Sequence, residues 1–344
     1  RVTTKDGRVL MKADPYAFFS DFRPKTDSKV YDLEGFEWHD EEWFRKKKKV
    51  YEQPLCVYEV HLGSWRRKDG EFMKANEIAP QLVQYMHEQG FTHVEFLPVY
   101  EHPLDDSWGY MGTGYYSVSA RFGVPKDFMY LVDEMHKNGF GVIMDWVPGH
   151  ICRDDFGLYM FDGSALYDYS DPKIRDNEVW GTANLDLGKG LTQSFLYSNA
   201  MFWLKYFHVD GFRVDAVSNI IYYLGNPANG VNEGACDFLR GLSRNLFAYD
   251  DRVLLMAEDS SAHDGVTRPV DMGGLGFNYK WNMGWMNDTL RYFKLDPIYR
   301  KYHHNLITFG LVYAFSEQFI LPLSHDEVVH LKASLLNKMP GDYW

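Results

Sequence analysis

The chain has 344 residues, of which 45% are hydrophobic and 17% aromatic, and its formal net charge is −12. This length accommodates one large domain with part of another. The acidic balance argues against binding to nucleic acid, which needs a basic surface, and against binding to an anionic membrane. The cysteines are far apart and form no CxxC pair, and no apolar signal segment or membrane span is evident. We therefore expect a cytoplasmic protein without disulfide bonds.

Residues 1–50 differ in pattern from the rest of the chain. They combine short strand-like stretches with many turn residues and end in the run "RKKKKV", which we expect to be a solvated helix end or linker. From residue 51 on, apolar strand-like segments alternate with helical segments that often close on glycine. Strands are expected within residues 55–63, 91–99, 140–150, 208–220, 252–260, 276–282 and 309–327, and helices at 78–90, 128–139, 192–209 and 234–249.

This alternation predicts an α/β fold with a parallel sheet covered by helices. Seven strand candidates fit a (β/α)8 TIM barrel. A doubly wound sheet is the alternative, but the first strand is followed by "HLGSWRRKDGE", which is not the expected GxGxxG. Polar residues gather at the carboxyl ends of several strands. Because those ends converge on one mouth of a barrel, they favour the barrel and a catalytic site there.

Arg213 and Asp215 are two residues apart in "GFRVDAV" and therefore share one face of the expected strand. Charged side chains in an interior strand are rarely buried unless they are paired. We expect Arg213 to hold Asp215 and keep it ionised as a nucleophile. Together with Glu258 and Asp326 it forms the candidate catalytic set, because two carboxylates are enough for glycoside cleavage. A single acid at a strand end would more often be structural; several such ends together favour catalysis.

Two further stretches carry polar pairs that could be structural if each stood alone. In "DWVPGH", Asp145 and His150 flank a Pro-Gly turn. In "SHDE", His325 and Asp326 could bind sugar hydroxyls.

Four stretches resemble the signature regions of the α-amylase superfamily, in the same order. They are "DWVPGH" (145–150), "GFRVDAV" (211–217), "AEDS" (257–260) and "SHDE" (324–327). Within that superfamily, "YEVHLGSW", "EHPLDDSWGYMGTGYYSVSARFG", "GFNYKWNMGWMNDTL" and "SHDEVVHLKASLLNKMPGDYW" are similar to the 1,4-α-glucan (glycogen) branching enzymes. Asp259, where Glu is commoner, and Leu331, where Gly is common, depart from that family's pattern.

The resemblance covers essentially the whole chain and implies its domain organisation. Residues 1–50 match the tail of a β-sandwich glucan-binding module with its linker, and residues 51–344 match a (β/α)8 barrel truncated after the seventh strand. We therefore expect a fragment of a longer protein, whose incomplete barrel exposes a strand edge and apolar surface.

The resemblance also implies roles for individual residues. Asp215 matches the nucleophile and Glu258 the proton donor, and Asp326 matches a third acid that distorts the sugar and stabilises the transition state. The other matches lie around the −1 sugar: Arg213, His150 and His325 beside it, Tyr110 as an aromatic platform beneath it, and Asp145 in a mainly structural position.

The implied reaction is retaining cleavage of an α-1,4 bond and transfer of the chain to a 6-hydroxyl, giving an α-1,6 branch. The expected substrates are glycogen and amylose, with no cofactor or metal, and the protein is expected to be a monomer. A hydrolase of the same superfamily, of the amylase or trehalose-releasing type, is one alternative. A catalytically silent glucan-binding protein is another.

Overall fold

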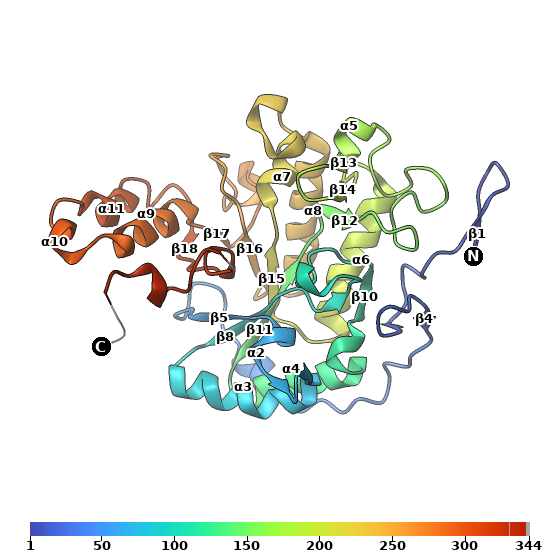
Figure 1. The fold of residues 1–344 in the computed structure, drawn as a ribbon, viewed down its shortest axis with the longest axis horizontal. Coiled ribbons are helices and arrows are strands. Elements are labelled where there is room, and N and C mark those ends of the chain that lie inside the picture. The colour runs from blue at the N-terminus through green and yellow to red at the C-terminus, as the bar shows by residue number, and fades with distance from the viewer. Residues whose placement is uncertain (330, 342–344) are drawn as a thin grey trace.

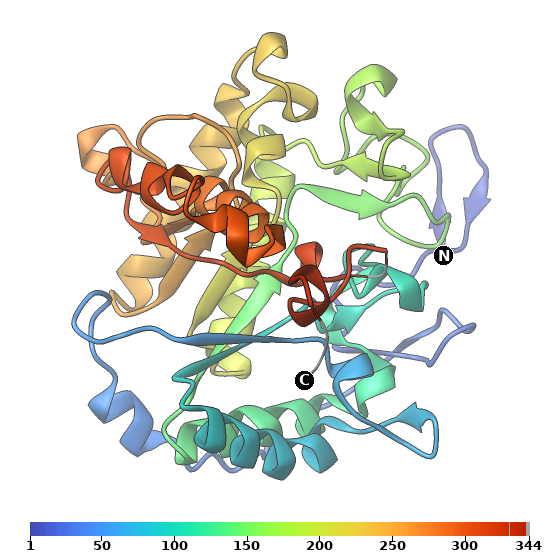
Figure 2. The same cartoon turned by 60° about the vertical axis from the view of Figure 1, so that its left-hand side comes forward.

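The computed structural model describes residues 1–329 and 331–341, so four positions of the last branching-enzyme-like stretch, 330 and 342–344, lie outside the described part. One parallel sheet curls into most of a barrel (Figures 1 and 2). Its strand order, β5-β8-β11-β15-β16-β17-β18, follows the chain, which confirms an incomplete (β/α)8 barrel and excludes the doubly wound alternative. The strands are β5 (Val57–Val60), β8 (His93–Phe96), β11 (Gly141–Trp146), β15 (Gly211–Val214), β16 (Leu254–Ala257), β17 (Tyr279–Trp281) and β18 (Phe319–Ile320).

The four predicted helices connect successive strands and lie on the outside of the curled sheet (Figure 1). Local chemistry explains their ends. Pro125 fits the first turn of its helix, where no backbone N–H is needed, and the Asp127 carboxylate accepts the Val124 N–H at 2.9 Å. At the end of another helix Gly90 takes φ +75°, which side chains disfavour. The helices are α3 (Ala75–Gln89), α4 (Pro125–Lys137), α6 (Gly190–Tyr206) and α8 (Glu233–Tyr249).

Smaller elements rise from the strand ends and surround the mouth of the barrel. After β11 the chain forms an antiparallel sheet of β12 (His150–Cys152), β14 (Thr182–Asn184) and β13 (Asp176–Asn177). After β8 it forms the hairpin β9 (Tyr100–Glu101) and β10 (Gly114–Val118). The other α-helices and strands described after residue 50 are α2 (Leu62–Trp65), β6 (Arg67–Lys68), β7 (Glu71–Phe72), α5 (Pro172–Arg175), α7 (Val217–Ile221), α9 (Met283–Lys294), α10 (Pro297–Arg300) and α11 (Asn305–Thr308). Within the described ranges, none of the helices has the length and apolar character to cross a membrane.

The segment before the barrel holds two short antiparallel ladders and a helix. The ladders pair β1 (Val2–Thr3) with β2 (Val9–Leu10) and β3 (Phe19–Ser20) with β4 (Ser28–Lys29), and α1 spans Glu41–Lys46. The assignment of residues 1–50 to the tail of a β-sandwich module stays a prediction.

A buried polar cluster ties this segment to the amino ends of the strands. Asp210, directly before β15, accepts from Trp43 Nε1 at 2.9 Å and pairs with Lys47 Nζ at 3.0 Å. The same carboxylate lies 2.9 Å from Nε2 of His136, whose Nδ1 lies 3.1 Å from Asp40. Lys47 is therefore buried, and the expectation that the whole lysine run is solvated is wrong at this position. The reason is a buried carboxylate that no local pattern reveals.

Candidate active site

The structure brings all eight candidate residues together in one cluster, to which the carboxyl ends of several strands contribute. Asp145 lies within β11 and Arg213 within β15, while Asp215 and Glu258 follow the ends of β15 and β16. Each of the eight is joined to another by a hydrogen bond, an ion pair or both. The set is Tyr110, Asp145, His150, Arg213, Asp215, Glu258, His325 and Asp326.

Arg213 is the centre of the cluster. Its Nη1 lies 2.9 Å from Asp145 Oδ1 and 2.5 Å from Asp215 Oδ1, and its Nη2 lies 3.8 Å from Glu258 Oε2. The guanidinium is buried and stacks on the Trp281 ring at 4.6 Å. A planar guanidinium suits this position because it holds its charge when buried and binds several carboxylates at once. The predicted pairing of Arg213 with Asp215 is present.

The chain reverses sharply after Asp215. The Asp215 N–H donates to Trp146 O at 2.9 Å. The next residue, Ala216, takes φ +49°, and Val217 begins the short helix α7. The strand expected within residues 208–220 therefore ends at Val214, and residues 217–221 form a helix instead. The left-handed conformation turns the Ala216 N–H toward Glu258, whose Oε2 accepts it at 2.7 Å.

Glu258 and Asp145 are buried carboxyl groups with raised pKa values. Burial raises the pKa of Glu258 to about 7, with the Arg213 charge opposing the rise and the Asp215 charge adding to it. Burial also raises the pKa of Asp145 to about 6, again against the effect of Arg213. A carboxyl group that holds its proton near neutral pH is suited to act as a general acid.

Tyr110 joins the two sides of the mouth. Its hydroxyl donates to Asp145 and lies 3.1 Å from Nε2 of His325, and the two rings stack with centroids 5.8 Å apart. His150, the first residue of β12, lies with Nε2 3.1 Å from the Tyr110 carbonyl oxygen. Burial lowers the pKa of His150, so its ring is neutral at neutral pH and donates from Nε2 to that carbonyl.

The sequence led us to expect His325 and Asp326 at the end of a strand, but the structure does not place them there. They form a 3-10 turn (His325–Glu327) after the short strand β18. This turn is anchored across the barrel, since Glu59 Oε2 accepts from the His325 N–H at 2.7 Å and lies 3.1 Å from its Nδ1. Burial opposes the charged imidazole, but Glu59, Asp326 and Asp145 together raise the pKa of His325. The side chain of Asp326 is 55% exposed, and its Oδ1 lies 3.4 Å from Nε2 of His325.

Several known proteins resemble this chain in sequence and in fold. Residues 77–184 match the family model described as alpha amylase, catalytic domain. The chain is 60% identical to 1,4-α-glucan branching enzyme GlgB of Bacillus caldolyticus, over 99% of this chain and 52% of that protein. The chain therefore resembles the α-amylase catalytic domain and the 1,4-α-glucan branching enzymes. It is also 58% identical to GlgB of Bacillus cytotoxicus, over 100% of this chain and 54% of that protein.

The chain thus spans about half the length of the curated relatives it matches. A crystal structure of an α-amylase candidate from Salmonella typhimurium has the same fold, with a TM-score of 0.68 at 22% identity. That match covers 89% of this chain and 49% of the other.

Sequence reasoning missed three residues of this site. Glu59 on β5 and Glu95 on β8 are register partners in the sheet, and Trp281 on β17 lies under Arg213. Burial, with Glu59 and Asp145 adding to it, raises the pKa of Glu95 well above its usual range. The signal was available, because "VYEV" and "HVEF" each place a charge inside an apolar strand as "FRV" does. Within the described ranges, no group of three or more His, Cys, Asp and Glu side chains is arranged to hold a metal ion.

Proposed function

We propose that this chain carries the retaining glycosyl-transfer site of a 1,4-α-glucan branching enzyme. The observation that carries the proposal is one buried guanidinium, Arg213, contacting both Asp215 and Glu258, the latter with a pKa of about 7. A nucleophilic carboxylate and a carboxyl group that donates a proton are the two groups that retaining glycosyl transfer needs. The relatives at 58% and 60% identity, both named 1,4-α-glucan branching enzymes, support the choice of reaction.

In the first step, Asp215 Oδ attacks the anomeric carbon of an α-1,4-linked glucose and forms a C–O bond to it. The glycosidic C–O bond breaks, its electron pair stays on the leaving oxygen, and Glu258 gives that oxygen its proton. In the second step Glu258 takes the proton of an acceptor 6-hydroxyl, whose oxygen attacks the same carbon. The bond to Asp215 breaks with its electron pair returning to the carboxylate, and an α-1,6 branch results.

The other residues of the proposal act on the sugar at the cleaved bond. Asp326, whose side chain is 55% exposed and lies beside His325, contacts the hydroxyls of that sugar and stabilises the transition state. Tyr110 supplies the aromatic platform, and its hydroxyl is fixed by Asp145. His150 borders the same space through its contact with the Tyr110 backbone. We propose glycogen and amylose as substrates, and a cytoplasmic location on the ground that the three cysteines are free.

The rate should depend on pH through Glu258. A general acid must be protonated, so kcat/KM is expected to be highest below the Glu258 pKa of about 7 and to fall as the pH rises through it. Above that pH the loss is about tenfold per pH unit. Initial rates on amylose between pH 5 and 9 measure this. A flat profile across neutral pH would contradict the assignment of Glu258.

Proton NMR of linear amylose incubated with the purified chain tests the reaction itself. New α-1,6 anomeric signals without a matching rise in reducing ends are the expected result. A rise in reducing ends without new α-1,6 signals would favour a hydrolase instead. A Glu258→Gln variant that behaves as the unsubstituted chain does would support a silent glucan-binding protein.

A further inference from the structure

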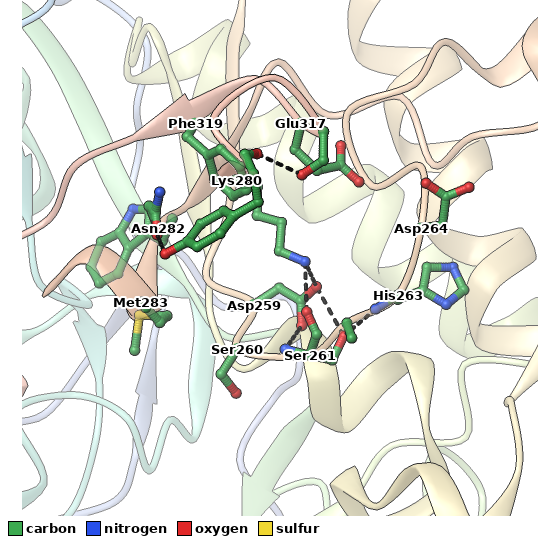
Figure 3. Close-up of a pocket in the computed structure, with 15 residues that line it drawn as sticks. Asp259, Ser260, Ser261, His263, Asp264, Lys280, Asn282, Met283, Glu317 and Phe319 are labelled. Atoms are coloured by element: carbon green, nitrogen blue, oxygen red, sulfur yellow. Dashed lines mark hydrogen bonds and ion pairs between the residues drawn. The ribbon is translucent and has the colours of Figure 1, made fainter. Parts of the chain in front are cut away.

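Asp259, the residue after Glu258, forms a buried ion pair with Lys280 (Figure 3). Lys280 Nζ lies 2.9 Å from Asp259 Oδ2. Trp281, the next residue of β17, faces Arg213, and neighbouring residues of a strand point to opposite faces. Lys280 therefore points away from the site. Asp259 meets it there, directly after the proposed proton donor Glu258.

The pair makes further hydrogen bonds that close a small turn. Lys280 Nζ also donates to Ser261 O at 2.8 Å. Asp259 Oδ1 accepts from the Ser261 N–H at 2.8 Å, and its Oδ2 accepts from the Ser261 hydroxyl at 3.1 Å. The exposed fractions of the Lys280 and Asp259 side chains are 8% and 0%. Burying two charges contributes little net stability, but a fully bonded network specifies one geometry.

Neighbouring charged groups do not compete for Lys280. A cavity of about 370 Å³ lies beside the pair and is also lined by Glu317 and Asp264 (Figure 3). The Glu317 carboxylate accepts backbone N–H groups of Gly265 at 2.8 Å and Val266 at 2.9 Å, besides Thr267. Asp264 pairs with Arg268 at 2.7 Å. Asp259 is thus the carboxylate that Lys280 binds, and the two residues act as one unit.

The pair completes the support of Glu258. On the side of β15, the Glu258 N–H donates to Val214 O at 3.0 Å, and its carbonyl accepts from the Val217 N–H at 2.8 Å. Its carboxylate accepts from Ala216 N–H. On the other side, the chain leaves β16 through Asp259, which is held by Lys280 and by the turn at Ser261. Freeing that side lets the Glu258 backbone shift relative to the leaving oxygen.

We propose that the Asp259–Lys280 ion pair is a positioning device that fixes the proton donor Glu258 from the opposite face of the sheet. This inference rests on the proposed function only in taking Glu258 as the general acid. A transferase and a hydrolase of the retaining type need that acid equally. Asp259 stands where Glu is commoner in the branching enzymes. Its carboxylate contacts both the turn at Ser261 and Lys280, as the proposed role requires.

The proposal can be tested with two substrates that differ in whether their leaving group needs a proton from Glu258. The glycosidic oxygen of amylose must be protonated as it leaves, whereas the fluoride of α-maltosyl fluoride leaves without a proton. Lys280→Met is expected to lower kcat/KM on amylose about 10- to 100-fold more than on α-maltosyl fluoride. Asp259→Asn, which keeps an acceptor for Ser261, is expected to give a smaller shift of about tenfold in the same ratio.

Lys47→Met is the matched control, because Lys47 and Asp210 form an equally buried pair at the other end of the sheet. That variant should leave the ratio of the two substrates unchanged. If Lys280→Met does not fold, Asp259→Asn decides the question. Equal losses on both substrates in Asp259→Asn would overturn the proposal. Reducing ends in place of branches from the unsubstituted chain would instead refute the proposed function and leave the ratio test valid.

Discussion

Asp215→Ala is expected to lower kcat for glucan transfer by about four orders of magnitude or more, as loss of a nucleophile does elsewhere. Without the carboxylate no glycosyl-enzyme can form, while Glu258 can still protonate the leaving oxygen. Adding sodium azide should restore part of the rate on α-maltosyl fluoride. The azide ion attacks the anomeric carbon in the space that Asp215 vacates, fluoride leaves, and a β-maltosyl azide accumulates. Chromatography and NMR of that product measure the rescue.

The control is Asp237→Asn on the outer helix α8, whose side chain is 71% exposed, and it should keep full activity. A second effect is expected in Asp215→Asn. Because the Asp215 charge helps to raise the pKa of Glu258, its removal should move that pKa below about 7. A ¹³C-NMR titration of the Glu258 carboxyl measures the shift. An Asp215→Ala variant that kept a tenth of the activity would rule out the nucleophile assignment.

The strands, the helices and the cluster of acids could be predicted because each follows from local pattern. A charged residue within an apolar strand indicates a side chain that faces inward and has a partner. Arg213 and its pairing with Asp215 were predicted in this way. The reversal at Ala216 could not be predicted in the same way. A left-handed alanine costs about 1–2 kcal/mol, and here its N–H binds Glu258, which is distant in sequence.

Contacts across the barrel were the second kind of feature that local pattern could not give. Glu59 binds His325 although 266 residues separate them, so neither residue signals its partner. The same holds for Lys47, which reads as one lysine of a solvated run. Its burial depends on Asp210, which lies in a loop just before β15. Charge in a strand predicts that a partner exists, and only the fold says which residue it is.

The second large effect is expected on stability. Asp210→Asn should lower the free energy of unfolding by about 3–5 kcal/mol, because it leaves the buried charges of Lys47 and His136 without their carboxylate. Although burial opposes its charged form, those two partners hold the pKa of Asp210 well below its usual range. Urea unfolding followed by tryptophan fluorescence measures the change, and Trp43, which donates to Asp210, reports on it directly.

Asp251→Asn is the matched control, because its ion pair with Lys49 is exposed and should leave the midpoint of unfolding within experimental error. The pH dependence separates charge from packing. Burial opposes protonated His136, but Asp210 and Asp40 raise its pKa above 6.5 in the folded chain. Its stabilising contribution is therefore complete below the unfolded value and is lost as the pH rises through the folded one. Asp210→Asn should weaken that loss, and an equal pH dependence in both proteins would contradict a charged His136.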